Sequence, residues 1–293
     1  MLWTVIERAI QETDSASFSL VNRQPVSGGC LHKTFVVDDG KRRYFVKLSD
    51  DPQSNILACE AHSLSILAAT DLIRVPRVIT SGRYEGGTFL VLEFLQLQRR
   101  DSVSDRHLGH RLGLLHRLPM ADFGWSEDNY IGANPQKNTP MTNWSEFWRA
   151  CRLGCQLRLA RENGYSGKLQ RLGERLLMEM DHLFEEHQPV PSLLHGDLWS
   201  GNAAALEGGE PVIFDPACYR GDREADLAMT ELFAGFSRDF YAAYDEVRPR
   251  KAGYTLRRDF YNLYHVLNHL NLFGGGYLCQ AEQMMERLLC EIV

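Results

Sequence analysis

The segment His195-Gly196-Asp197-Leu198-Trp199-Ser200-Gly201-Asn202 carries the most information about fold and chemistry in this sequence. An asparagine follows Asp197 by five positions, and the apolar run that starts at Pro211 ends in a second aspartate, Asp215. One carboxylate can hold and deprotonate a hydroxyl, while an amide oxygen and a second carboxylate can hold Mg²⁺ against nucleotide phosphates. The order and spacing of these residues therefore predict phosphoryl transfer.

The same segment is similar to the catalytic loop H-R-D-L-x-x-x-N of protein kinases, with Gly196 in the place of the arginine. Asp215-Pro216-Ala217 then takes the position of D-F-G. An isolated H-G-D triplet can also be a turn with an aspartate cap, but the spaced Asn202 and Asp215 weaken that interpretation. A protein kinase is disfavoured, because no A-P-E-like segment follows Asp215 and Asp222-Arg223-Glu224 comes within a few residues.

A lysine and a glutamate near the N-terminus support the same chemistry. Lys47 lies near the end of a run rich in β-forming residues, and Glu60 lies on the helix predicted to follow. Kinases use such a lysine to neutralise phosphates and position it with a helix glutamate. A surface lysine at a strand edge is the alternative interpretation. The pairing with Glu60 favours the functional one.

Other parts of the N-terminal region are candidates for nucleotide contact. Gly28-Gly29 is not G-x-G-x-x-G, but it precedes the strands that deliver Lys47 and is a candidate phosphate-covering loop. A Walker A site is excluded, because His32 and not glycine precedes Lys33-Thr34. Glu93 and Leu95 lie where two predicted lobes join. Backbone groups there are candidates for binding adenine, and a plain strand end is an equal alternative.

The order of predicted elements indicates two lobes. Up to residue 94 the sequence predicts mainly strands around one main helix at residues 52–70. Beyond it the patterns predict helices at 105–117, 144–163, 168–187 and from 223 to 293, with breaks near Pro249 and Gly274, and an irregular stretch at 123–142. We therefore expect an α+β, two-lobed, protein-kinase-like fold. Residues 1–94 would form a small antiparallel β-sheet lobe that binds nucleotide, and residues 95–293 a larger, mostly helical catalytic and substrate lobe.

Composition excludes several classes of protein. Hydrophobic residues make up 44% of the 293 residues and charged residues 24%, which is globular usage rather than disordered, fibrous or membrane composition. The net charge of −6 offers no general attraction for nucleic acid or anionic lipid. With no signal-peptide pattern and an odd count of seven cysteines, free thiols and a cytoplasmic location are expected.

The sequence resembles the fructosamine/ketosamine-3-kinase family, within the aminoglycoside and choline phosphotransferase branch of kinase-like folds, almost from end to end. The matching segments are Ser27–Cys30, Phe45–Lys47, Glu60-Ala61, Phe123–Trp125, Asp128–Gly132, Asn143-Trp144, Phe147-Trp148, His195–Asn202, Phe214–Ala217, Arg223–Met229 and Leu267–Gly274. The run F-G-W-x-x-D-N-x-I-G at residues 123–132 is the most specific to this family. The H-G-D-x-x-x-x-N core is shared more widely.

The resemblance implies ATP- and Mg²⁺-dependent phosphorylation of the 3-hydroxyl of a ketosamine, which is a sugar attached to an amine. The phosphorylated adduct would decompose and release the amine, so the biological sense would be deglycation of a small molecule or a protein. By the same resemblance, Asp197 would be the catalytic base, Asn202 and Asp215 would ligate Mg²⁺, and Lys47 would contact phosphates while paired with Glu60.

Further residues receive expected roles from their position and type. His195 and Asp226 would support the catalytic loop. The candidates for sugar contact are Trp199, Trp125, Asp128 and Asn129, with core packing and a turn as alternatives. Cys30 is either an inert small residue or a redox-responsive thiol near Lys33; oxidant sensitivity that disappears in Cys30→Ala would identify the latter.

Two other functions remain open at this stage. An aminoglycoside- or choline-type phosphotransferase would share the fold, although the run at residues 123–132 argues against it. A non-catalytic nucleotide-binding module would lack one of Asp197, Asn202, Asp215 or Lys47, and all four are present. The chain could act as a monomer or a homodimer.

Overall fold

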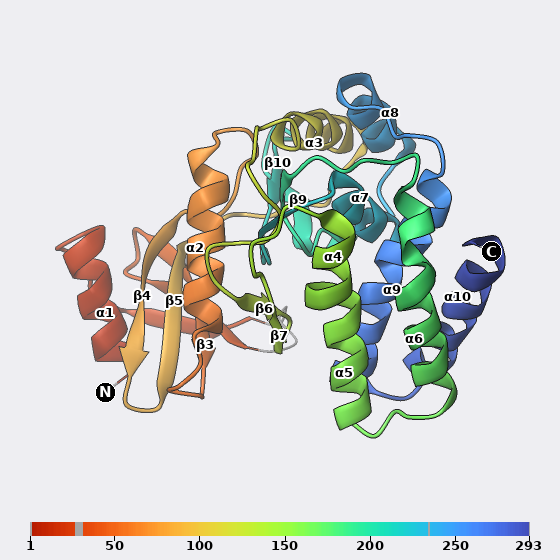
Figure 1. Ribbon diagram of the computed structural model, residues 1–293. Helices are drawn as coiled ribbons and strands as arrows, with labels where there is room; N and C mark the ends of the chain where they lie inside the picture. Colours follow the sequence, from red (N-terminus) through yellow and green to blue (C-terminus); the bar gives the residue numbers. More distant parts are fainter. Residues whose placement is uncertain (1, 27–31, 234, 293) are drawn as a thin grey trace.

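The computed structural model describes residues 2–26, 32–233 and 235–292, and it confirms the α+β architecture (Figure 1). The N-terminal part contains a five-stranded sheet in the order β1-β2-β3-β5-β4, with antiparallel neighbours throughout. Its strands are β1 (Asn22–Pro25), β2 (Lys33–Asp38), β3 (Arg43–Ser49), β4 (Val78–Tyr84) and β5 (Gly87–Glu93). The turn between β2 and β3 contains Gly40, whose φ of 84° suits glycine.

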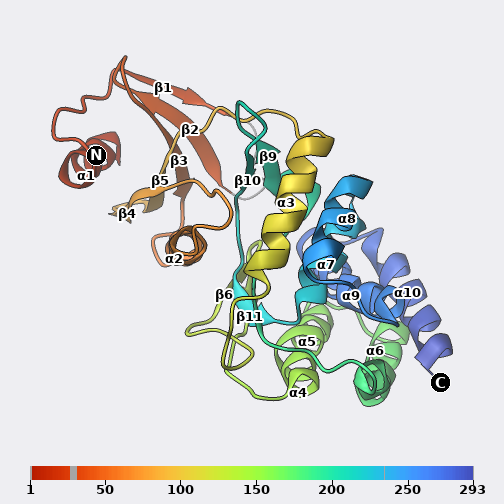
Figure 2. The ribbon, with the colours of Figure 1, turned by 90° about the horizontal axis from the view of Figure 1, so that it is seen from above.

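Two helices pack on opposite faces of this sheet (Figure 2). The expected helix is α2 (Ile56–Ala69), and the structure adds α1 (Leu2–Thr13). Val46 and Leu48 of β3 pack in the hydrophobic cluster that includes α1. Because successive side chains of a strand point to opposite faces, Lys47 lies on the face that carries α2.

The rest of the chain is mostly helical, as expected. Its helices are α3 (Ser102–Leu115), α4 (Trp144–Trp148), α5 (Gly154–Glu162), α6 (Lys168–Glu179), α7 (Arg223–Leu232), α8 (Arg238–Val247), α9 (Tyr254–Phe273) and α10 (Tyr277–Ile292). A π-helical turn (Arg149–Leu153) joins α4 to α5, and a 3₁₀ turn (Met180–Phe184) follows α6. The breaks expected near Pro249 and Gly274 separate α8 from α9 and α9 from α10.

Short strands form three two-stranded ladders that carry the loops of this part. They pair β6 (Asn129–Ile131) with β7 (Asn134–Gln136), β8 (Ser192–Leu194) with β11 (Tyr219–Gly221), and β9 (Ala203–Ala205) with β10 (Pro211–Ile213). The stretch at residues 123–142 was expected to be irregular. That prediction is partly wrong, since the β6–β7 hairpin lies within the stretch. Strands of three residues are too short to show an alternating hydrophobic pattern.

Backbone hydrogen bonds tie the sheet region to the helical region. Gln98, in the segment between β5 and α3, exchanges two backbone hydrogen bonds with Ala205, of 2.7 and 3.0 Å. The N–H of Ile213 donates to the carbonyl of Arg74 over 3.0 Å. These contacts place β9 and β10 beside the N-terminal sheet. Within the described residues, no helix is long and apolar enough to cross a membrane.

Candidate active site

A cleft of about 720 Å³ lies between the sheet and the helical region. Its walls come from β2, β3, α2 and the end of β5 on one side, and from the β6–β7 hairpin, the loop after β8, the segment after β10, α7, α9 and α10 on the other. Of the residues predicted from sequence, the cleft lining includes Lys47, Glu60, Glu93, Leu95, Asn129, Asp197, Trp199, Asn202 and Asp215. The structure thus brings widely separated segments to one cavity.

The catalytic-loop candidate is held by a buried carboxylate from α7. Asp226 is 1% exposed and accepts hydrogen bonds from the backbone N–H groups of His195 (2.7 Å) and Gly196 (2.8 Å). Gly196 has a φ of 84°, and a Cβ at this position would lie 2.1 Å from the carbonyl oxygen of Ala217. Only glycine fits there, which explains why this loop has glycine where protein kinases have arginine.

His195 lies behind the loop rather than in the cleft. Its ring is fully buried, and Nε2 lies 3.0 Å from the carbonyl oxygen of Phe214. Burial lowers the pKa of this imidazole, so the ring is neutral near pH 7. With Nε2 donating to that carbonyl, Nδ1 can accept from the N–H of Asp197 over 3.3 Å. The arrangement is consistent with the supporting role expected from the sequence.

Asn202, a candidate metal ligand, is hydrogen-bonded to Asp197, the candidate base. Its Nδ2 donates to the backbone oxygen (2.9 Å) and to Oδ2 (3.3 Å) of Asp197. That leaves Oδ1 of Asn202 without a hydrogen-bond partner among the described residues. Asp215 has a φ of 57°, an uncommon backbone conformation for a residue other than glycine. Backbone strain of this kind concentrates at functional sites.

Lys47 bridges two carboxylates from opposite walls. Its Nζ lies 2.7 Å from Oε1 of Glu60 and 2.6 Å from Oδ1 of Asp215. Burial opposes the lysine charge, but the two carboxylates outweigh it and raise the pKa of Lys47. Burial raises the pKa of Glu60 to about 7 against the lowering effect of Lys47.

Asp197 has the electrostatics of a proton acceptor. Burial first, and then the negative charge of Asp215, raise the pKa of its carboxyl group from 3.8 to about 7. A group with that pKa can accept a proton near neutral pH and release it again. The site therefore combines a carboxyl group that could act as a base, two side chains whose oxygen atoms could hold a cation, and a lysine held by two carboxylates.

The nucleotide-contact predictions have different outcomes. The side chain of Glu93 is engaged with Arg74 (2.6 Å) and with the N–H of Arg77 (2.6 Å), so any base contact at Glu93 falls to the backbone. Leu95 lies next to it in the cleft lining. The predictions for Gly28, Gly29 and Cys30 fall outside the described residues.

Two of the four candidate substrate residues lie outside the cleft lining. Trp125 is 7% exposed and belongs to the hydrophobic core, with the guanidinium of Arg220 5.7 Å from its ring centroid. Asp128 pairs with Lys137 at 2.6 Å on the outer side of the β6–β7 hairpin. Neither belongs to the cleft lining. A tryptophan suits core packing and sugar stacking equally well, so residue type alone did not separate the two.

The other two substrate candidates do reach the cleft. Trp199 is 37% exposed and lies edge-to-face against Phe233, with centroids 6.2 Å apart. Asn129 reaches it as well, but this residue is 3% exposed and its side chain makes three hydrogen bonds within the protein. A group of polar and aromatic residues with no role expected from the sequence completes this wall: Phe233, His265, Asn268, His269, Phe273 and Tyr277. The only signal was the family-like run at residues 267–274.

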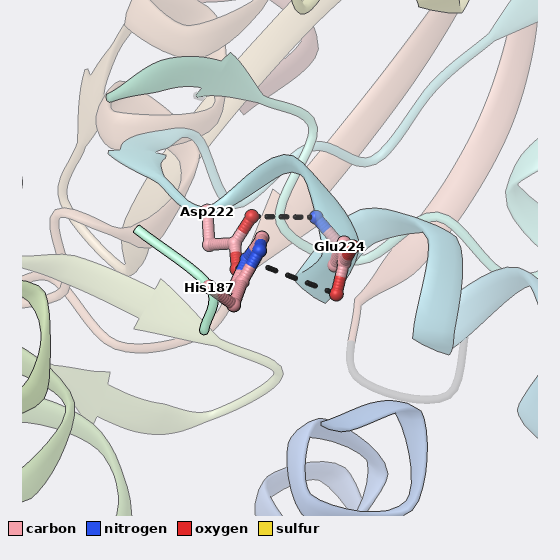
Figure 3. A group of neighbouring side chains, drawn as sticks. All are labelled: His187, Asp222 and Glu224. Carbon is pink, nitrogen blue, oxygen red and sulfur yellow. Dashed lines mark hydrogen bonds and ion pairs between the residues drawn. The ribbon is translucent and has the colours of Figure 1, made fainter. Parts of the chain in front are cut away.

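A second cluster of titratable groups lies outside the cleft (Figure 3). His187, Asp222 and Glu224 could hold a metal ion by proximity, with Nε2 of His187 2.6 Å from Asp222. Their carboxylates already have protein partners. Arg257 pairs with Glu224 at 2.7 Å, and the hydroxyl of Tyr261 donates to Asp222 over 2.7 Å. We interpret the cluster as a buried ion-pair network.

Comparisons with known proteins identify relatives that match nearly the whole chain. The pattern of the family described as Fructosamine kinase matches residues 2–291. A Synechocystis protein named "Probable ketoamine kinase" is 45% identical over 288 residues, which cover 98% of this chain and 97% of the relative. The chloroplastic protein-ribulosamine 3-kinase of Arabidopsis thaliana is 39% identical over 280 residues, covering 94% of this chain and 85% of the plant protein.

Solved structures show the same fold. A candidate fructosamine-3-kinase from Haemophilus somnus superposes with a TM-score of 0.91 at 28% identity, covering 98% of this chain and 97% of that one. An aminoglycoside phosphotransferase and a choline kinase, at 15% and 14% identity with TM-scores of 0.66 and 0.62, share the fold alone. Since the family pattern spans nearly all residues and close relatives are aligned end to end, this chain belongs to the fructosamine kinase family and is a kinase that phosphorylates a hydroxyl group.

Proposed function

We propose that this protein transfers the γ-phosphoryl group of ATP to the 3-hydroxyl of a ketosamine. The observation that carries the proposal is the convergence of Lys47, Asp197 and Asp215 on one cleft. The family and the relatives named as ketoamine and ribulosamine kinases support the choice of acceptor.

The cleft offers ligands that suit Mg²⁺. Oδ1 of Asn202 and the carboxylate of Asp215 are oxygen ligands, which this hard cation prefers, and the Asp215 side chain is 42% exposed and so accessible from the cleft. Bound there, Mg²⁺ would neutralise charge on the phosphates. Lys47, held by Glu60, supplies a further positive charge for the phosphate oxygens.

We propose that the two lobes divide the work at residue 94. Residues 1–94 hold the phosphates of the nucleotide through Gly28, Gly29 and Lys47, and the backbone of Glu93 and Leu95, on either side of the boundary, binds the adenine base. Residues 95–293 supply the catalytic loop and the acceptor site. The composition of the cleft walls supports the division, because β2, β3 and α2 line one side and the loop that carries Asp197, with α7 and α9, lines the other.

Asp197 acts as the general base of the transfer. Its carboxylate accepts the proton of the acceptor hydroxyl as that oxygen bonds to the γ-phosphorus. The bond from the γ-phosphorus to the bridging oxygen breaks, and ADP leaves with that electron pair. Trp199, two residues from the base and partly exposed in the cleft, offers an aromatic surface to the sugar. The product would be a 3-phosphorylated ketosamine, whose decomposition releases the amine and completes deglycation.

The proposal is tested by phosphate transfer from ATP across a panel of acceptors. The panel contains fructose, ribulose and erythrulose adducts of free lysine and of a glycated protein, with an aminoglycoside and choline as controls. Asp197→Asn supplies the background rate. We expect transfer to at least one ketosamine, at the 3-hydroxyl by mass spectrometry of the product. Transfer to the aminoglycoside or choline, with none to any ketosamine, would contradict the proposal.

A further inference from the structure

The β6–β7 hairpin is hydrogen-bonded to the backbone that follows Asp215. Nδ2 of Asn129 donates to the carbonyl of Cys218 over 2.8 Å, and Nε2 of Gln136 donates to the carbonyl of Ala217 over 3.2 Å. Just before the hairpin, Gly124 exchanges two backbone hydrogen bonds with Arg220, of 2.9 and 2.8 Å. Four hydrogen bonds from one region thus reach three of the four residues 217–220.

A buried polar network fixes the hairpin itself. Oδ1 of Asn129 accepts from both Gln136 and Asn138 at 2.8 Å, and Oδ1 of Asn138 accepts from Arg152 at 2.8 Å. The hydroxyl of Tyr264 in α9 donates to Oε1 of Gln136 over 2.8 Å. These three amides are at most 3% exposed. Buried networks in which members satisfy one another are rigid.

Arg152 anchors this network in an unusual way. Its side chain is fully buried, and its guanidinium makes hydrogen bonds to the carbonyls of Lys137 and Cys151 and to Asn138, with no carboxylate among them. The charge lies 3.9 Å from the ring centroid of Tyr219 in β11. A single buried cation therefore joins the hairpin to the segment that leads away from Asp215.

The same segment is fixed on its other side by the catalytic loop. The N–H of Phe214 donates to the carbonyl of Asn202 over 3.1 Å, and the N–H of Ala217 donates to the carbonyl of His195 over 2.8 Å. Asp215 lies between these two anchors in a left-handed conformation, with a φ of 57°. A strained backbone conformation persists only where neighbouring contacts hold it in place. Here the hairpin supplies some of those contacts.

We propose that the β6–β7 hairpin is a permanent brace that positions Asp215 for the metal, with Asn129 and Gln136 as positioning residues. In protein kinases the segment after this aspartate becomes ordered when the activation loop is phosphorylated. Here the hairpin holds the segment after Asp215 in place, so the site is assembled without phosphorylation. The inference rests on the metal role proposed for Asp215, and it reassigns Asn129 from sugar contact to backbone support.

The test compares Asn129→Ala and Gln136→Met with Lys137→Ala. The last variant removes an exposed ion pair from the same hairpin, 58% exposed at the lysine, and leaves residues 217–220 untouched. Binding of a non-hydrolysable ATP analogue is measured by calorimetry with and without Mg²⁺. Hydrogen exchange of residues 214–221 is followed in parallel, and thermal melts confirm folding. If Asn129→Ala does not fold, the near-isosteric Gln136→Met decides.

We expect the wild type and Lys137→Ala to gain affinity from Mg²⁺. The two brace variants should lose about tenfold to a hundredfold of that gain, the usual effect of removing support around a metal ligand. Their metal-free affinity should be unchanged and the Ala217 amide should exchange faster. Folded brace variants with the full Mg²⁺ gain would overturn the brace alone. A wild type that gains nothing from Mg²⁺ would overturn the metal role of Asp215, and the brace with it, whatever the acceptor panel shows.

Discussion

Lys47 and Asp215 are 168 residues apart in the sequence, and their side chains form an ion pair of 2.6 Å between the two walls of the cleft. The lysine side chain is 8% exposed and also pairs with Glu60, which is 10% exposed. A buried cation shared by two carboxylates holds both walls to one geometry. Removing it would leave the buried carboxylate of Glu60 without a counter-charge and facing that of Asp215.

We first predict the effect of Lys47→Met. Removing one partner of a buried ion pair destabilises a protein by about 3–5 kcal/mol, because the remaining charges lose their compensation. Lys47→Met/Glu60→Gln should recover part of this stability while ATP binding stays weak. Chemical denaturation and nucleotide titration measure the two effects. Lys33→Met is the control, because its pair with Asp50 is also 2.6 Å long but about two-thirds exposed, and such exposed pairs contribute little to stability. Equal losses in both lysine variants would refute the prediction.

The second prediction concerns the base. Asp197→Asn should lower turnover by about 10²–10⁴, the usual contribution of a positioned general base. Nucleotide binding should persist, because Lys47, Asn202 and Asp215 are unchanged. Initial rates and nucleotide affinity are measured on the same preparation. Normal turnover in this variant would remove Asp197 from the mechanism.

A third prediction follows from the raised pKa of Asp197, about 7 in the folded protein against an ordinary value of 3.8. Between these values the folded state keeps a proton that the unfolded state has lost, so this group makes stability fall as pH rises from about 4 to about 7. Asp197→Asn removes that penalty. Its melting temperature should therefore exceed that of the wild type by an amount that grows from pH 5 to pH 7 and is constant above. A difference independent of pH would show that the carboxyl group titrates normally.

The catalytic loop, Lys47, Glu60 and Asp215 could be predicted from sequence because phosphoryl transfer restricts residue type and spacing within short segments. The sheet and most helices followed from hydrophobic periodicity. The wall formed by His265, Asn268 and His269 could not be predicted. The period of a helix shows which face is buried, but not whether that face meets the core or a cleft.

The hairpin was missed for a different reason. Asn129 and Gln136 are polar residues in a loop-like sequence, and the carbonyls to which they donate lie 89 and 81 residues later in the chain. The sequence left both core packing and sugar contact open for Trp125, because an aromatic ring serves the two equally. In both cases tertiary contacts, and not local pattern, decide the role.

The final prediction concerns the cluster of His187, Asp222 and Glu224. If it is an ion-pair network, Glu224→Gln leaves the 3% exposed Arg257 without its carboxylate, which should cost about 3–5 kcal/mol of stability. A chelator should leave the melting temperature of the wild type unchanged, because Arg257 and Tyr261 already occupy the carboxylates. Glu246→Gln, which breaks the exposed pair with Arg106, is the matched control and should have little effect. A melting temperature that falls with chelator and recovers with zinc would instead identify a structural metal site, since a bound ion stabilises the folded state by its binding free energy.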